Sequence, residues 1–167
     1  MIEMRVNNKV NYFVFILSLL LGIFLELLPV PAWVNWYKPD WLLLIGIFWV
    51  MTAPEIFNVV FIWMLGLFLD ALKGSLLGEH AFAMLIVIFI FLKFQRRFRL
   101  YSLAQQTWFI LLFVILYHFI IFIIQGTINE LPNNYAYWGA CLTSMFFWPS
   151  SYLFLRDWNK KFMHSPS

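Results

Sequence analysis

The sequence predicts an all-α integral membrane protein whose six transmembrane helices form one compact bundle. Of 167 residues, 63% are apolar and 22% aromatic, while only 11% are charged, so an ordinary water-facing surface cannot be built from this chain. The apolar residues are gathered into stretches that approach the length needed to cross a hydrocarbon core of about 30 Å. These stretches occupy most of the chain. We therefore expect one domain, 1–167, with no soluble catalytic domain.

Six apolar stretches are expected to span the membrane. The first is predicted to be retained, because its apolar core is longer than that of a signal peptide and no small-residue cleavage site follows it. Thr52, Pro54 and Glu55 form a Ser/Thr-x-x-Glu capping pattern, which separates the second span from the third and makes Glu55 a helix cap. Pro149 is expected to bend the last helix. The predicted spans are about 10–28, 41–53, 55–71, 81–94, 104–125 and 135–155.

The basic residues predict the orientation of these spans. With six spans, both termini are cytoplasmic, and only Lys38 and Lys73 of the eleven Lys and Arg residues lie outside. A single span over 41–69 would instead give five spans and turn some of the basic clusters outward. The outer loop 29–40 carries Trp33, Trp36 and Tyr37, a composition typical of headgroup depth. The cations assigned to the cytoplasmic side are Arg5, Lys9, Lys93, Arg96, Arg97, Arg99, Arg156, Lys160 and Lys161.

Glycines and an acidic residue recur at four-residue spacing near the end of the third span. In a helix, Gly66, Asp70 and Gly74 share one face, and small residues at this spacing allow a second helix to approach closely in lipid. A carboxyl group is too costly there to face acyl chains. Together with Ser75 and Gly78, this segment is either a partner-binding or bundle-packing face, or the end of a helix that Asp70 caps, with the glycines in the following turn.

Other polar residues have two interpretations each. The cluster Lys93, Arg96, Arg97 and Arg99 is expected to lie along the inner surface and contact anionic lipid, or to dock a cytoplasmic partner. His118, well inside the fifth span, is expected to be neutral and bonded to a helix carbonyl or a hydroxyl, with a proton relay as the alternative. Glu26 is expected to be a solvated residue at the outer rim, and Cys141 a small packing residue.

The sequence shows none of the residue patterns that common membrane enzymes need. The three histidines are far apart and assigned to different membrane faces, and no His-Glu-x-x-His or Cys-x-x-Cys motif is present. Ser75 lacks the Gly-x-Ser-x-Gly setting of a hydrolase nucleophile. We therefore expect no catalytic residue, no metal site, no cofactor and no nucleic-acid partner, and a function that depends on contacts between helices.

The order of several motifs resembles the MreD family of bacterial rod shape-determining proteins. The resemblance covers nearly the whole chain, includes Trp148-Pro149, and is most specific in the segment from Gly66 to Gly78 and in the Pro-x-Trp of residues 39–41. It also includes Lys38-Pro39-Asp40-Trp41, the Ala53-Pro54 break and the basic residues at both ends. The resemblance implies a non-enzymatic inner-membrane subunit of the cell-wall elongation machinery. It further implies a six-helix fold similar to the substrate-binding subunits of energy-coupling-factor transporters, but no catalytic residues.

Two functions are compared on this basis. The resemblance implies an adaptor that binds the periplasmic scaffold MreC and links it to the filament protein MreB, the glycosyltransferase RodA and its partner transpeptidase. Self-association into a homo-oligomer is also compatible with the sequence. The alternative is a transporter subunit that binds a vitamin-like molecule in an outer cavity lined by Trp33, Trp36, Tyr37 and the loop 126–134. Few polar groups are expected to converge in such a cavity, which argues against a hydrophilic ligand.

Overall fold

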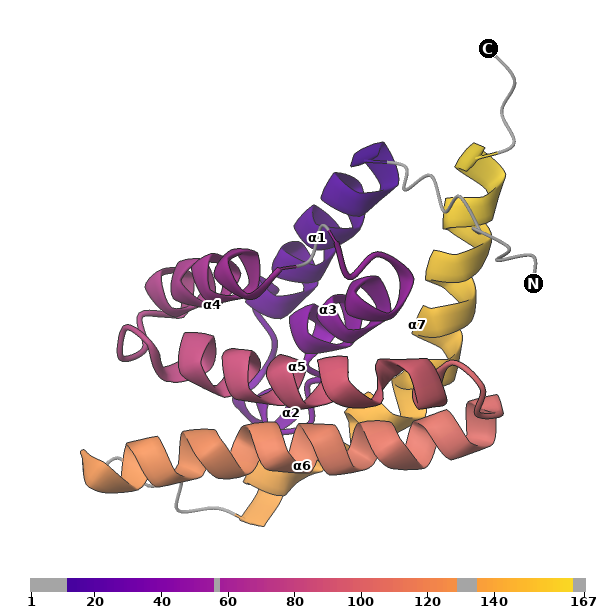
Figure 1. Ribbon diagram of the computed structural model, residues 1–167. Coiled ribbons are helices and arrows are strands. Elements are labelled where there is room, and N and C mark those ends of the chain that lie inside the picture. The colour runs from indigo at the N-terminus through magenta and orange to yellow at the C-terminus, as the bar shows by residue number, and fades with distance from the viewer. Residues whose placement is uncertain (1–11, 56–57, 129–134, 164–167) are drawn as a thin grey trace.

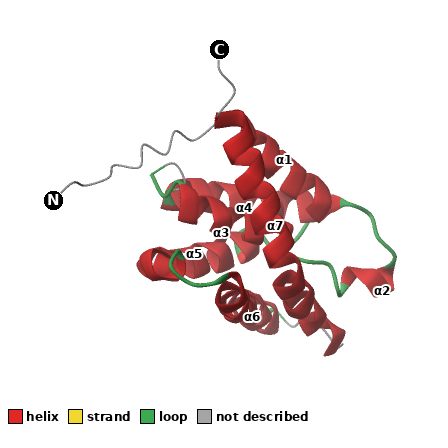
Figure 2. Cartoon of the chain, turned by 90° about the vertical axis from the view of Figure 1, so that its right-hand side faces the viewer, coloured by secondary structure: helices red, strands yellow, loops and turns green. Residues whose placement is uncertain are grey.

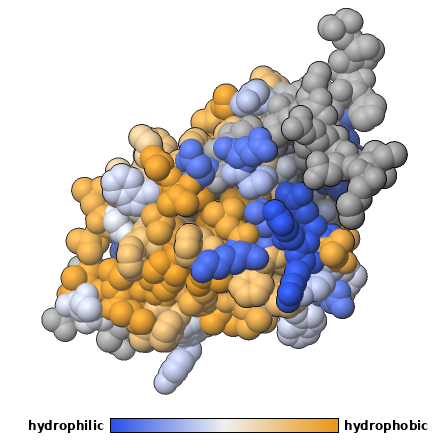
Figure 3. Space-filling view, viewed as in Figure 1, coloured by the Kyte–Doolittle hydropathy of each residue, from blue (hydrophilic) through white to orange (hydrophobic). Residues whose placement is uncertain are grey.

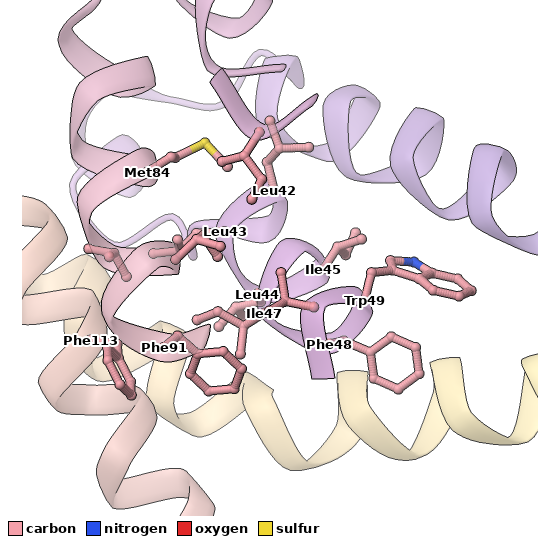
Figure 4. Close-up of a cluster of buried hydrophobic side chains, with 14 of the residues drawn as sticks. Leu42, Leu43, Leu44, Ile45, Ile47, Phe48, Trp49, Met84, Phe91 and Phe113 are labelled. Atoms are coloured by element: carbon pink, nitrogen blue, oxygen red, sulfur yellow. The ribbon is translucent and has the colours of Figure 1, made fainter. Parts of the chain in front are cut away.

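Helix α3 (Trp41–Thr52) lies at the centre of the structure, a computed structural model that describes residues 12–55, 58–128 and 135–163. Ten consecutive residues of this helix, 42–51, are buried. They include Ile47, Trp49 and Val50, which have no exposed surface at all. A helix that is apolar on every side is surrounded by protein or by lipid, and here other helices surround it. In Figure 4, side chains from α5 and α6 meet those of α3 in the buried cluster.

The described residues are otherwise also helical or in connecting loops, and they form no strand. Helices α1, α5 and α7 contact α3 directly. Helix α4 packs along α5, and α6 contacts both α5 and α7. Figures 1 and 2 show α5 and α6 side by side, and in Figure 1 α3 lies on the other side of α5, between α4 and α7. The surrounding elements are α1 (Tyr12–Leu27), α2 (Ala32–Asn35), α4 (Val59–Lys73), α5 (Glu79–Phe98), α6 (Leu103–Thr127), η1 (Tyr135–Trp138) and α7 (Gly139–Met163).

Each of the six predicted apolar stretches contains a helix, but the start of the third was wrong. Helix α4 begins after Asn58, whose side chain accepts a hydrogen bond of 2.9 Å from the Phe61 N–H. Thr52 is the last residue of α3, and Glu55 lies in a turn. An Asn side chain at the N-cap accepts a hydrogen bond from a free N–H group of the first helical turn, as the predicted Ser/Thr-x-x-Glu pattern would have done. The capping role predicted for Glu55 therefore belongs to Asn58.

The basic cluster after the fourth stretch is part of a helix. Helix α5 continues for 20 residues to Phe98, whose ring is buried in the core against Phe91 and Trp148. Phe98 is therefore part of the core, although it lies among the cations that were expected along the inner surface. The next helix begins with Ser102, which forms a reciprocal capping box with Gln105.

Exposed apolar side chains cover much of the surface that the structure describes. Large apolar residues on α1, α4, α6 and α7 are more than half exposed, among them Phe24, Met64, Leu112 and Phe146. Figure 3 shows these apolar surfaces over most of one face, with hydrophilic residues gathered in the right half of the view. Of the described helices, α6 alone is long and apolar enough to meet a composition test for a membrane span, and α1 and α3 are shorter apolar helices. Such a surface is typical of a membrane protein.

Candidate functional site

A cavity of about 610 Å³ lies at the end of the bundle where the loop after α1, the α4–α5 turn, the end of α6 and the start of α7 meet. This volume is in the range of small-molecule sites. Its apolar lining includes Trp36 and Ile121. The polar groups that line it come from seven elements or loops: Glu26, Asn35, Lys38, Asp40, Lys73, His80, Tyr117, His118, Gln125 and Tyr137. The expectation that few polar groups converge at this place was wrong.

The residues that line this cavity also differ from those predicted. Trp36 lines it as predicted, but Trp33 and Tyr37 do not, and both side chains are more than half exposed. Residues 129–134 of the expected loop lie outside the described residues. The ring of Tyr37 instead packs against Gly139 at the start of α7, where a Cβ atom would collide with it. Glycine at this position therefore lets the loop 29–40 lie close to α7.

Asp40 and His118 form a buried pair deep in the cavity wall. The Asp40 Oδ2 atom lies 2.8 Å from the His118 Nε2 atom, although 78 positions separate the two residues in the chain. The Asp40 N–H donates to the Ser144 hydroxyl at 3.0 Å, and the Tyr137 hydroxyl donates to the His118 carbonyl at 3.0 Å. The partner predicted for His118 was a carbonyl or a hydroxyl, and this was wrong, because the ring faces a carboxylate.

Glu26 and Lys73 form a second pair, with 2.6 Å between the carboxylate and the ammonium group. Glu26 is 7% exposed. The prediction of a solvated rim residue was therefore wrong: a carboxylate so deeply buried needs a cation, and the end of α4 supplies one. The ammonium group of Lys38 donates to the carbonyl oxygens of Glu26 and Leu28. Partial burial lowers the pKa of Lys38, with Glu26 opposing this shift and Lys73 adding to it.

Next to the cavity, the Asp70 carboxylate has several hydrogen-bond partners. Its side chain is completely buried and accepts hydrogen bonds from the backbone N–H groups of Gly78, His80 and Ala81 at 2.9, 2.9 and 3.3 Å. The Ser75 hydroxyl donates to it at 3.1 Å, and the His80 Nδ1 atom lies 2.8 Å away. Gly78, the N-cap of α5, has no side chain to cap the helix. A residue of α4 therefore caps the first turn of α5.

The glycines near Asp70 have different roles. Gly66 lies directly against Ala81 of α5, and a Cβ atom there would collide with its backbone. Gly74 and Gly78 have φ angles of +65° and +100°, which favour glycine, and a Cβ at either would meet no atom within 4 Å. Gly74 thus belongs to the turn after α4. It does not extend the close-packed face of Gly66 and Asp70 as the four-residue spacing suggested.

Ser75, His80 and Asp70 have the residue types of a hydrolytic triad but a different geometry. The His80 Nδ1 atom lies 2.8 Å from Asp70 and 3.4 Å from the Ser75 hydroxyl, so both contacts involve the same ring nitrogen. In a catalytic triad the serine and the carboxylate contact opposite nitrogens of the ring. Within the described part of the chain, no group of three His, Cys, Asp or Glu side chains is placed to hold a metal ion. The arrangement supports hydrogen bonding and ion pairing.

The basic cluster lies away from the cavity, at the carboxyl end of α5. The Lys93 ammonium group lies 4.8 Å from the centre of the Phe89 ring, and the Arg99 guanidinium donates to the Met51 carbonyl in the last turn of α3. Arg96 and Arg97 are exposed. Arg99 therefore connects two helices, whereas Arg96 and Arg97 remain available for a surface contact.

Several residues of the site were not recognised in the sequence. Asp40 and Lys38 were assigned to an interfacial loop, and Gln125, which donates to Glu79 at 2.6 Å, was assigned only to the end of a span. One signal was available: His118, inside an apolar stretch, needs a polar partner. Ser144, which accepts from the Asp40 N–H, was assigned only to the last span. No pattern within one helix could reveal that both residues meet Asp40.

Comparison with known proteins gives a consistent result. A family model described as rod shape-determining protein MreD matches residues 7–158. The chain is 28% identical over 161 residues to the rod shape-determining protein MreD of Haemophilus influenzae, an alignment that covers 95% of this chain and 98% of that protein. No solved structure matches the chain. The family match covers most of the sequence and agrees with an apolar helical fold, so this chain belongs to the MreD family of rod shape-determining membrane proteins.

Proposed function

We propose that the protein is a non-enzymatic adaptor that crosses the inner membrane six times, with both termini in the cytoplasm. It binds MreC directly and links it to MreB, RodA and the partner transpeptidase of the elongation machinery. The family supports a role in rod shape. The observation that carries the adaptor mechanism is the structure's broad exposed apolar surface, because a helix of a partner in lipid can pack only against surfaces that the bundle itself leaves open.

The face of Gly66 and Asp70 is not such an open surface. Both residues are buried against α5 of the same chain. Of the two roles considered for this face, locking the bundle therefore has the stronger support. A partner helix would then bind elsewhere, and the surface formed by α1, α3 and α7 is the first place to test.

This surface carries an apolar groove of about 270 Å³ that contains two hydroxyl groups. Its walls include Leu21, Trp41 and Phe154, together with Ser150 and Ser151 of α7. Small hydroxylated residues within an apolar surface favour close contact between helices in lipid. The single transmembrane helix of MreC is the occupant that we propose, because a largely apolar lining suits an apolar helix within the membrane.

The test is co-purification of MreC with a Ser150→Leu variant, whose longer side chain would fill the groove. Ser150 is exposed and bonds only to the Phe147 carbonyl of its own helix, so folding should be kept. We expect at least a severalfold loss of bound MreC at equal expression. Val60→Leu on the exposed face of α4 is the matched control and should retain MreC. Equal capture by both variants would exclude this groove as the MreC site.

The alternative function, a vitamin-binding transporter subunit, gains one observation from the structure, the polar cavity. A soluble vitamin-like molecule that binds only the folded protein would raise its melting temperature. Such a rise, with no capture of MreC by the wild-type protein, would favour the transporter over the adaptor.

A further inference from the structure

The charged groups that line the cavity form pairs, with one exception. Glu26 is paired with Lys73 at 2.6 Å, and Asp40 with His118 at 2.8 Å. His80 lies 2.8 Å from Asp70. The charges of Glu26 and Lys73 offset each other, and both aspartates lie within hydrogen-bond distance of an imidazole nitrogen. Lys38 is the lining cation that remains.

Lys38 is held by neutral groups. Its ammonium group donates to the main-chain carbonyls of Glu26 and Leu28, and among the described residues no carboxylate oxygen lies within 4 Å of it. An ammonium group has three N–H donors, so two carbonyl acceptors leave one donor unused. A partly buried cation that contacts no carboxylate is a place where a ligand anion replaces lost hydration.

Further donors surround the same space. The Lys73 side chain is 27% exposed beside its partner Glu26, and the Tyr117 and Gln125 side chains also line the cavity. The one other nearby carboxylate, Glu79, is buried, bonded to Gln125 and absent from the lining. The cavity therefore matches a group with one negative charge, two or more acceptor oxygens and a size within about 610 Å³.

We propose that this cavity binds a singly charged phosphodiester group, with Lys38 as its main contact and Lys73 as the second. The group could be carried by an acidic lipid headgroup or by a soluble phosphodiester, and both present the same two non-bridging oxygens. The choice of a phosphodiester over a carboxylate rests on the membrane placement proposed above, which puts the cavity, with Trp36 in its lining, at headgroup depth.

The experiment measures the melting temperature of the full chain in detergent with three probes. These are phosphatidylglycerol, phosphatidylcholine as the lipid without net charge, and glycerophosphoglycerol, the soluble headgroup of the first. We expect a saturable rise with phosphatidylglycerol that is larger than with phosphatidylcholine. A rise with glycerophosphoglycerol of the same size identifies a soluble ligand, and a rise with the lipid alone identifies the bilayer as the source.

Lys38→Met and Lys38→Arg are the variants that test the contact. The first should weaken the apparent affinity about tenfold, the loss typical of one charge-assisted hydrogen bond, and the second should keep most of it. Arg97→Met, which removes an exposed cation at the other end of α5, is the matched control and should bind as the wild type does.

Two results would overturn the proposal: a wild-type protein that neither anionic probe stabilises, or a Lys38→Met variant stabilised as strongly as the wild type. If Lys38→Met does not fold, native mass spectrometry of the wild type decides, since retention of phosphatidylglycerol no greater than that of phosphatidylcholine would also reject it. Capture of MreC is measured separately. Stabilisation without capture would therefore uphold this site and reject the adaptor function.

Discussion

At the scale of single residues, Asp70 shows how a buried charge becomes part of the fold. Its carboxylate has no exposed surface, yet three backbone N–H groups, one hydroxyl and one imidazole satisfy its oxygens. Such a group contributes to stability only while all its partners are in place. The structure thus gives Asp70 the role of a helix cap, although the helix that it caps is α5 and not its own.

Asp70→Ala should lower the free energy of unfolding by about 3 kcal/mol, because it leaves the first turn of α5 and His80 without an acceptor. Asp70→Asn keeps one acceptor oxygen and should cost less. Chemical unfolding in detergent micelles measures both. Asp157→Asn, at a carboxylate whose side chain is 67% exposed, is the control and should change stability by less than about 0.5 kcal/mol. A similar cost at both positions would argue against the capping role.

Gly66→Ala should destabilise the protein by about 1–3 kcal/mol, since the added methyl group collides with the Ala81 backbone. Gly74→Ala meets no neighbouring atom and should cost only the strain of a left-handed backbone, about 1 kcal/mol. Thermal unfolding of the two variants under one condition provides the comparison. A cost at Gly74 greater than that at Gly66 would contradict the observed packing.

At the scale of elements, the sequence predicted the positions of the helices in the chain well and their packing against one another poorly. The apolar stretch at 41–53 became α3, as predicted, but nothing in it showed that this helix would be the central one. A helix with no polar face can be surrounded by protein or by lipid, and composition cannot distinguish the two. In the same way, Asp40 and His118 lie in separate elements, 78 positions apart, so no helical periodicity connects them.

Because α3 is central, an Ile→Ala substitution should cost more stability in α3 than on the exposed surface of α6. Ile47→Ala removes methyl groups from a side chain with no exposed surface and should cost about 2–5 kcal/mol. Ile123→Ala, in α6, shortens a side chain that is 51% exposed and should cost much less. The free energies of unfolding of the two variants test this, and equal values would mean that α3 is not the core helix.

At the scale of the whole molecule, many of the polar groups that the structure describes gather at two separate places. One is the cavity with its paired charges, and the other is the carboxyl end of α5 with its exposed arginines. Between them the surface is largely apolar, as expected if lipid surrounds the bundle. The sequence predicted this separation from the positions of the cations. It could not predict the cavity, because four separate parts of the chain contribute its charged pairs.

The proposed orientation can be tested with single cysteines in a Cys141→Ala background. Leu77→Cys in the α4–α5 turn and Leu100→Cys in the α5–α6 turn are suitable, since the two leucines are 71% and 86% exposed. A maleimide that cannot cross membranes should label intact cells, with the outer membrane permeabilised, at position 77 and not at 100. The reverse labelling would invert the orientation, and labelling of both would exclude a span between them.

The cap that Asp70 provides has a consequence for how the molecule assembles. The three amide groups that it satisfies lie 8 to 11 positions further along the chain, so α4 and α5 need no third element to complete the turn between them. During synthesis this hairpin can therefore close as soon as the start of α5 has emerged. We expect it to be an early folding nucleus, onto which the later helices α6 and α7 dock.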